Sequence, residues 1–347
     1  MQVLGRVFLV CAVSVMLGGC RGTEGTQQAA DPVGGEKIQI GMVFDNFVME
    51  RWQRDRDVFV STAKELGAEV NVQNANGSVE EQQELMEYFI RKQVDVIVIV
   101  PVDSEPLLDS IRKAQGNGIK VICYDRLVVG AEPDLYISFD NTQVGSLMGE
   151  ALVSRLNAED KVLMICGPVT DHNVTEVQAG FRETMEKGNI EILDIHYVEE
   201  WKPEYAEAYV RQNSTLLGEV KGIMCGNDNL AGKTVSVLAE QRLAGDILVT
   251  GQDADLAACQ RIVEGTQYMT VYKPIEKMAA CTAQAAVTLA ENGALDTDVY
   301  TAADGTQIPY IKMEPVSVTA QNIQEVIIDS GFHLKADVYL NRPDLLE

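Results

Sequence analysis

Charged, amide and aromatic side chains follow several apolar runs of this 347-residue sequence, at the points where buried strands are expected to end. Residues 250–255 are the clearest case, because Gly251 allows a tight turn and two carboxylates follow it. In an open α/β sheet, ligands bind just beyond the carboxyl ends of the strands. The candidate ligand-binding residues at such positions are Arg51, Trp52, Asp125, Arg126, Asp171, Asn173, Trp201, Asn227, Asp253 and Lys273.

The formal charges of these ten residues sum to zero. Three cations stand against three carboxylates: Arg51, Arg126 and Lys273 against Asp125, Asp171 and Asp253. Carboxylates only accept hydrogen bonds and these cations only donate them, whereas a hydroxyl group does both. Charge-assisted hydrogen bonds are also the stronger ones. A neutral but densely charged site therefore favours an uncharged ligand with many hydroxyls, such as a sugar, over a phosphate or an amino acid.

Each of these residues also has a purely structural interpretation. Asp253 or Asp255 could cap the following helix, and Asp171 could do the same for its own helix. Arg51 could form a surface ion pair with Asp55 four residues later. Asp45 and Asp228 fit turns or caps, and Trp52 fits the core as well as a cleft. The flanking charges favour ligand stacking over a core position for Trp201.

The elements that must position these groups alternate regularly. Apolar runs of the kind buried on both faces of a parallel sheet predict strands in both halves of the chain. Amphipathic segments between the runs predict helices, and Ser78 is expected to cap one of them. The predicted strands are 38–44, 69–73, 94–100, 120–124 and 135–138, then 162–165, 191–197, 222–225, 247–250 and 266–271.

This alternation predicts an α/β fold with two doubly wound parallel-sheet domains joined by a multi-strand hinge. The facing strand ends would then enclose a cleft that opens and closes. The predicted organisation is a signal peptide at 1–19, a lipidated cysteine and tether at 20–36, and a first lobe of 37–139 with part of 311–335. A second lobe of 140–272, a helix and return crossover of 273–310, and a tail of 336–347 follow.

The N-terminus predicts export. Arg6 precedes an apolar run that is too short to span a bilayer, and the run ends in Leu-Gly-Gly-Cys at Cys20. This motif resembles the bacterial lipobox, which predicts a lipid anchor at Cys20 and an extracytoplasmic location; a plain secretory signal is the alternative. The polar segment 21–36 is a predicted tether.

Composition and residue counts exclude several classes of function. A net charge of −24 argues against a nucleic-acid partner. The cysteines have no zinc-type spacing, and the five expected in the mature chain beyond Cys20 are interpreted as mostly buried free thiols. With three histidines in the sequence, we predict no metal site, no cofactor and no catalytic triad. Asp296 and Asp298 are a weak indication of calcium, and a surface loop is the preferred interpretation.

The chain resembles the ribose-type periplasmic sugar-binding proteins of ABC transporters, and in particular their xylose-binding members. The resemblance rests on residues 50–57, 124–126, 136–141, 251–256 and 269–274. It implies that the ten candidate residues contact a monosaccharide. His172 departs from the family pattern, in which we expect Asn.

The resemblance also implies a monomeric, non-catalytic, lipid-anchored protein that captures a monosaccharide, D-xylose first, for the membrane subunits of an ABC transporter. A sensor that signals the bound state to a membrane histidine kinase is the alternative. A sugar-responsive repressor would need a DNA-binding segment in place of the first 36 residues. A glycosidase would need one protonated acid, which the neighbouring cations disfavour.

Overall fold

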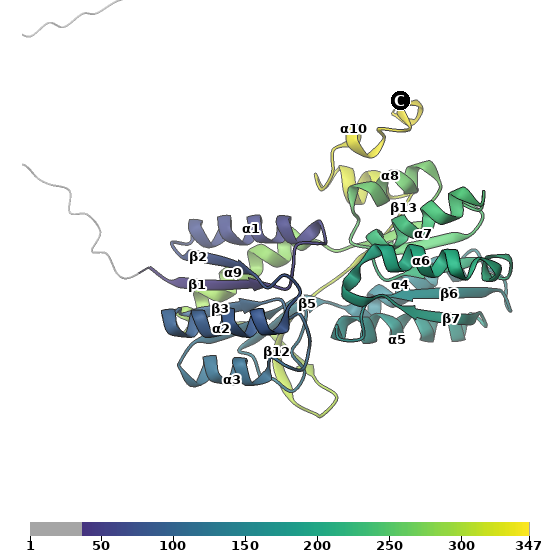
Figure 1. Cartoon of the computed structure of the whole chain (residues 1–347). Coiled ribbons are helices and arrows are strands. Elements are labelled where there is room, and N and C mark those ends of the chain that lie inside the picture. Colours follow the sequence, from purple (N-terminus) through teal and green to yellow (C-terminus); the bar gives the residue numbers. More distant parts are fainter. Residues whose placement is uncertain (1–36, 347) are drawn as a thin grey trace, which may run out of the picture. The chain divides into compact units, whose positions relative to one another are not determined.

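Two β-sheets with helices on both faces make up residues 37–346, the part of the chain that this computed structural model describes (Figure 1). Residues from Lys37 onward form one unit. The predicted signal peptide, the lipidation site at Cys20 and the tether lie outside the described residues. Among the described residues, no helix is long and apolar enough to cross a membrane.

The first sheet has the strand order β11-β12-β5-β4-β3-β1-β2 and is parallel except for β11 at its edge. Short buried runs such as Val-Ile-Val-Ile in β3 suit strands that are covered on both faces. The strands are β1 (Gln39–Phe44), β2 (Glu69–Asn74), β3 (Val96–Ile99), β4 (Lys120–Tyr124), β5 (Leu135–Phe139), β11 (Asp298–Thr301) and β12 (Gln307–Met313).

Helices cover both faces of this sheet. Phe59 of α1 (Arg51–Glu65) and Met278 of α9 (Ile275–Ala290) belong to one core cluster. Phe89 of α2 (Val79–Lys92) and Ile111 of α3 (Leu108–Gly116) belong to the cluster on the opposite face. The predicted cap of α2 is confirmed, because the Ser78 side chain accepts a hydrogen bond from the Glu81 backbone N–H.

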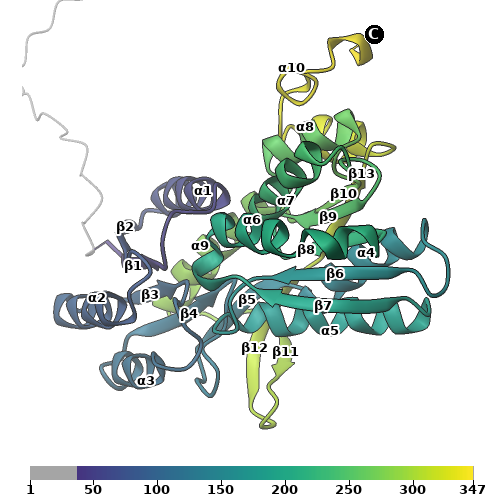
Figure 2. The same ribbon diagram turned by 45° about the vertical axis from the view of Figure 1, so that its right-hand side comes forward.

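The second sheet has the order β13-β10-β9-β8-β6-β7 and is parallel except for β13. Its strands are β6 (Lys161–Cys166), β7 (Glu191–Tyr197), β8 (Gly222–Cys225), β9 (Leu248–Gln252), β10 (Met269–Tyr272) and β13 (Val316–Thr319). Its helices are α4 (Asn141–Val153), α5 (His172–Lys187), α6 (Pro203–Gln212), α7 (Asp228–Glu240) and α8 (Leu256–Glu264). Figure 2 shows α4 and α5 beside β6 and β7.

Two glycines allow α4 and α5 to approach closely. A Cβ atom added to Gly145 would lie 1.9 Å from the Val177 carbonyl oxygen, and one added to Gly180 would lie 1.9 Å from the Thr142 carbonyl oxygen. Any larger residue would push the helices apart. This contact fixes α5 against α4, and two of the candidate residues stand at the start of α5.

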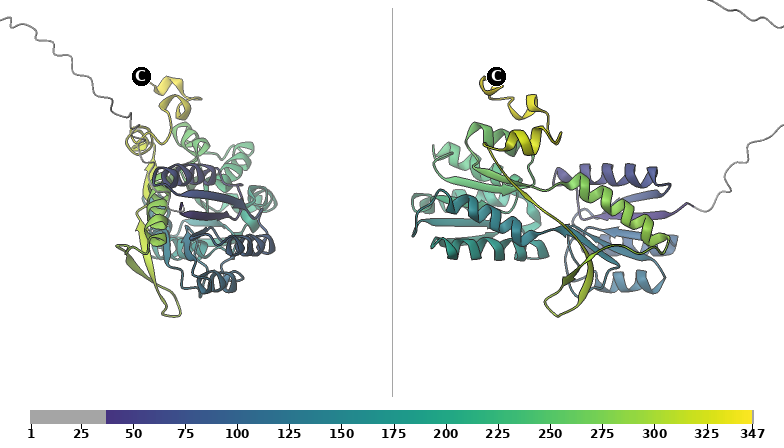
Figure 3. Two further views of the ribbon diagram at one scale, coloured as in Figure 1. Left: turned by 90° about the vertical axis from the view of Figure 1, so that its left-hand side faces the viewer. Right: turned by 180° about the vertical axis from the view of Figure 1, so that it is seen from behind.

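Three segments connect the two sheets, and Figure 3 shows the long return connection from behind. Asp140 joins β5 to α4, residues 273–274 join β10 to α9, and residues 314–315 join β12 to β13. Together they form the predicted hinge region, and Lys273 lies within it.

The C-terminal third departs most from the sequence prediction. The segment 273–310, predicted as a helix and a crossover, contains α9 but also β11 and part of β12, which extend the first sheet. β13 joins the second sheet, and α10 (Lys335–Val338) contacts α8. The strands are short and partly exposed, so their apolar signal is weak. All five cysteines of the described chain are free, as predicted.

Candidate sugar-binding site

One pocket lies where strand ends of the two sheets meet, with about 480 Å³ of non-atom space that includes open solvent. All ten predicted residues line it: Arg51, Trp52, Asp125, Arg126, Asp171, Asn173, Trp201, Asn227, Asp253 and Lys273. The six charged side chains among the pocket-lining residues are the same three cations and three carboxylates predicted from the sequence, so the lining is neutral in sum.

On the side of the first sheet, Asp125 follows β4 and adopts a left-handed backbone conformation with φ of +64°. Such a conformation is unfavourable for most residues and is common at functional sites. Arg51, the first residue of α1, forms an ion pair with Asp125, with 2.8 Å between Nη2 and Oδ2. Both side chains are buried, so this ion pair is shielded from solvent.

Arg126 connects the two halves of the site. Its Nε atom lies 2.7 Å from Oδ2 of Asp171, which begins the first helix after β6 in the second sheet. Asp171 also caps α5, because its Oδ1 accepts a hydrogen bond from the Asn173 backbone N–H. Capping and pocket lining are therefore two roles of one carboxylate, not alternatives.

Trp201 lies against backbone that only glycine allows. A Cβ on Gly167 would come within 2.2 Å of the indole ring, and one on Gly226 within 3.1 Å. The indole Nε1–H donates to Asp171 Oδ2 at 3.2 Å, and the backbone of Trp201 has φ of +57°. Trp201 is buried and packs in the second core as well as lining the pocket, so the expectation that it avoids the core is wrong.

Asp253 follows β9 with a strained φ of +100° and points into the same pocket. Lys273 Nζ lies 2.7 Å from Asp253 Oδ1 but outside hydrogen-bond geometry, so the contact is an ion pair. Arg51 Nη1 is farther away, at 3.8 Å. The capping interpretation is not supported, because α8 begins after Asp255, whose side chain makes no capping hydrogen bond.

Two further carboxylates stand behind the pocket. Asp45 Oδ2 lies 2.7 Å from Arg126 Nη1, and Asp55 lies 3.4 Å from Arg51 Nε. Both are buried, which corrects the interpretation of Arg51 and Asp55 as a surface pair and of Asp45 as a plain turn residue. They orient the two guanidinium groups toward the pocket.

The protonation states follow from burial and from these cations. Burial raises the pKa of Asp125, but Arg51, Lys273 and Arg126 outweigh it, and the net pKa lies below the ordinary value. Burial raises the pKa of Asp55 to about 6, against the opposing effect of Arg51. An ionised Asp125 is an acceptor for hydroxyl groups and is unsuited to act as a general acid.

Five buried polar atoms that belong to pocket-lining residues have no hydrogen-bond partner within residues 37–346. Two are donors, Trp52 Nε1 and Asn227 Nδ2, and three are acceptors, Asn173 Oδ1, Gln252 Oε1 and the ion-paired Asp253 Oδ1. The other end of each amide is engaged, which fixes its orientation: Asn227 Oδ1 caps α7, Asn173 Nδ2 bonds Asp125, and Gln252 Nε2 bonds the Gly226 carbonyl. Buried unpaired groups are costly, so each calls for a partner.

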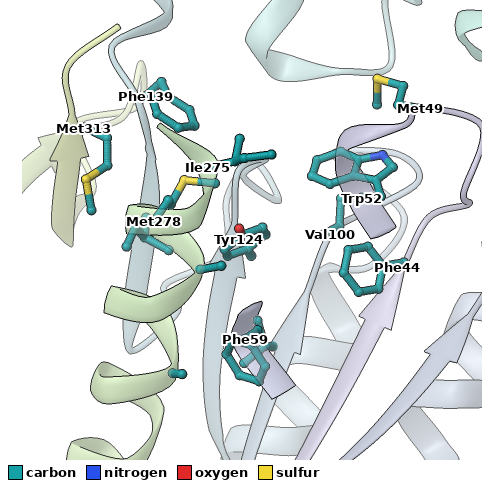
Figure 4. Close-up of a cluster of buried hydrophobic side chains, with 14 of the residues drawn as sticks. Phe44, Met49, Trp52, Phe59, Val100, Tyr124, Phe139, Ile275, Met278 and Met313 are labelled. Atoms are coloured by element: carbon teal, nitrogen blue, oxygen red, sulfur yellow. The ribbon is translucent and has the colours of Figure 1, made fainter. Parts of the chain in front are cut away.

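Trp52 is at once a core residue and a pocket residue. It is fully buried, and Figure 4 shows its indole between Met49 on one side and Val100 and Phe44 on the other. The Arg51 guanidinium lies 4.3 Å from the ring centroid. The core therefore holds one side of the ring while its N–H remains available to the pocket.

Sequence reasoning missed three polar groups at the pocket, Asn141, Gln252 and the Cys166 thiol. Asn141 and Gln252 lie inside the motifs quoted above, so position after a strand could have found them. Burial raises the pKa of Cys166 to about 12, so the thiol is neutral. Within residues 37–346, no group of three or more metal-ligating side chains is placed to hold an ion.

Comparison with known proteins agrees with this architecture. A family model described as periplasmic binding protein domain matches residues 40–294. A carbohydrate transporter solute-binding protein from Chloroflexus aurantiacus, solved in complex with D-glucose, superimposes with a TM-score of 0.79 at 25% identity, over 86% of this chain and 98% of that one. Two lobes enclosing a polar pocket thus define a solute-binding protein with the type I periplasmic-binding-protein fold.

The chain belongs to the periplasmic binding protein domain family. Curated relatives include the D-xylose-binding periplasmic proteins of Haemophilus influenzae and Escherichia coli. Each is 37% identical over 308 residues, which span 87% of this chain and 92% and 93% of the relatives, respectively. These relatives are named as binding proteins and not as enzymes.

Proposed function

We propose that this protein captures D-xylose, or a closely related aldopyranose, between its two lobes and delivers it to the membrane subunits of an ABC transporter. The names of the two relatives at 37% identity support the sugar, and their coverage of nearly the whole chain supports the shared role. The ten candidate residues would supply the sugar contacts.

The observation that carries the proposal is the mixture of unpaired donors and acceptors around a neutral pocket. Trp52 Nε1 and Asn227 Nδ2 need acceptors, and Asn173 Oδ1 and Gln252 Oε1 need donors. A ring of hydroxyl groups satisfies both kinds at once, since each hydroxyl donates one hydrogen bond and accepts others. The indoles of Trp52 and Trp201 suit the apolar C–H surface of a pyranose ring.

A thermal-shift panel of monosaccharides tests the proposal. At a xylose concentration about 100 times Kd, ligand linkage supports an increase in melting temperature on the order of 5 °C. Ribose, arabinose, glucose and galactose serve as matched sugars that differ in hydroxyl direction or ring substituent. The absence of a shift with every pentose and hexose would refute sugar binding, and a larger shift with another sugar would replace xylose.

We also propose that Cys20 carries a lipid that anchors the protein on the extracytoplasmic face of the membrane. The lipobox-like Leu-Gly-Gly-Cys supports this. In cells that express the full chain, Cys20→Ala should move the protein from the membrane fraction to the soluble fraction. Intact mass measurement of the mature wild type should give a lipid adduct on an N-terminus that begins at Cys20; an unmodified mass would exclude the anchor.

A further inference from the structure

Tyr300 reaches from one lobe to the other. It lies on β11 at the edge of the first sheet, and its hydroxyl contacts α5 in the second lobe. The hydroxyl oxygen lies 2.8 Å from His172 Nε2 and 3.0 Å from Glu176 Oε1. These two side chains are one helical turn apart, with Nε2 and Oε1 separated by 3.6 Å.

The hydrogen-bond directions are determined by the chemistry of the three groups. An ionised Glu176 only accepts, so the single Tyr300 hydroxyl proton is donated to it. The hydroxyl oxygen is then an acceptor, and His172 must donate its Nε2–H. Each member thus has a defined role, and the contact is a closed triangle across the lobes.

The triangle continues into the pocket. Glu176 Oε2 accepts from Asn141 Nδ2 at 3.1 Å, and Asn141 lies 3.4 Å from Ser138 Oγ. Ser138 in turn donates to the carbonyl of Asp125 at 2.6 Å. On the other side, His172 stands between two pocket residues, Asp171 and Asn173, at the start of α5.

We propose that Tyr300, His172 and Glu176 form a latch between the lobes that slows release of the bound sugar. The latch lies outside the pocket lining, so it acts on the stability of the closed arrangement and not on sugar recognition. This inference rests on the proposed function, because it presupposes that the lobes separate to release a ligand.

The tyrosine ring is held independently of its hydroxyl. It packs edge-on against Tyr136 at 5.3 Å and against Tyr310 at 5.6 Å between ring centroids. Tyr300→Phe therefore removes the hydroxyl and keeps the ring contacts. Tyr310→Phe is the matched control, since its hydroxyl donates to the Phe139 carbonyl and has no hydrogen bond to α5.

Stopped-flow fluorescence measures the release rate directly, because the only two tryptophans of the chain, Trp52 and Trp201, both line the pocket. We expect Tyr300→Phe to raise the xylose dissociation rate constant by about 30-fold or more, the effect of losing a charged and a neutral hydrogen bond. The association rate constant and the melting temperature of the free protein should change little. Tyr310→Phe should leave the dissociation rate constant within about twofold of wild type.

A double-mutant cycle separates a latch from a general loosening. If Tyr300 and Glu176 act together, Tyr300→Phe combined with Glu176→Ala should be no faster in release than the faster single variant. If the two substitutions multiply each other's effect on the xylose dissociation rate constant, the latch is refuted. It is also refuted if Tyr300→Phe and Tyr310→Phe have equal dissociation rate constants. Should one variant fail to fold, His172→Ala provides the same comparison, with the same expected and contrary results. Failure of the wild type to bind any sugar would refute the proposed function instead.

Discussion

Asp125 and Asp253 occupy corresponding places in the two lobes but are paired differently. Each follows a parallel strand with a positive φ and lines the same pocket. Both oxygens of Asp125 are engaged, Oδ2 by Arg51 at 2.8 Å and Oδ1 by Asn173 at 3.2 Å. Asp253 accepts no side-chain hydrogen bond from the described residues and has only ion pairs.

The difference suggests a division of labour between the lobes. A carboxylate whose lone pairs are already used mainly fixes the position of its neighbours. A carboxylate with unused acceptor capacity gains more from a ligand hydroxyl. Asp125 therefore organises the site, and Asp253 is the stronger candidate for gripping the sugar.

The largest expected effect is on affinity at Asp253. Asp253→Asn keeps the shape but removes a charged acceptor, so we expect xylose affinity to fall roughly 100-fold, by about 2–3 kcal/mol. Isothermal titration calorimetry measures the change. Asp109→Asn, an exposed change on α3, is the control and should bind like wild type. A loss below about threefold would contradict the gripping role.

The next largest expected effect is on the free energy of unfolding, in a variant of Asp125. Asp125→Asn removes the shortest ion pair of the buried Arg51, although Asp55 remains beside the guanidinium. We expect the free energy of unfolding to drop by about 2 kcal/mol, measured by denaturant titration without sugar. Affinity should fall less than in Asp253→Asn. If Asp125→Asn lost more xylose affinity than Asp253→Asn, the proposed difference in role between the two aspartates would be refuted.

The smallest effect tests the surroundings of Asp253. Burial, then Asp228 and Asp253, raise the pKa of Asp255 well above its ordinary value. Because the folded-state pKa exceeds the unfolded one, ionisation costs stability as pH rises from the unfolded pKa toward the folded pKa. Asp255→Asn removes that cost.

The stability of Asp255→Asn relative to wild type should therefore improve as the pH rises from 5 to 8. Denaturant titrations at the two pH values measure the difference. Asp298→Asn, an exposed change on β11, should give the same difference from wild type at both values. If Asp255→Asn gained the same stability over wild type at both pH values, the gain would not come from the ionisation of Asp255.

The parallel strands, their alternation with helices and the cap at Ser78 were predictable, because each depends on short runs of sequence. β11 and β12 were not predicted, since the exposed edge strand 298–301 has little apolar pattern and β12 depends on pairing with the distant strand β5. The unused donor on Trp52 and the buried pairing of Asp45 with Arg126 were equally hidden. Both depend on contacts between residues far apart in the chain.

The sequence by itself determined which chemistry is available: equal numbers of fixed charges placed after strands, with glycines where the backbone must turn. Only the tertiary structure decided which of those groups satisfy one another and which remain open. Hydrogen bonds are short and directional, so their pairing depends on atomic positions that spacing along the chain does not specify. The link from Tyr300 to His172, 128 residues apart, is of the same kind.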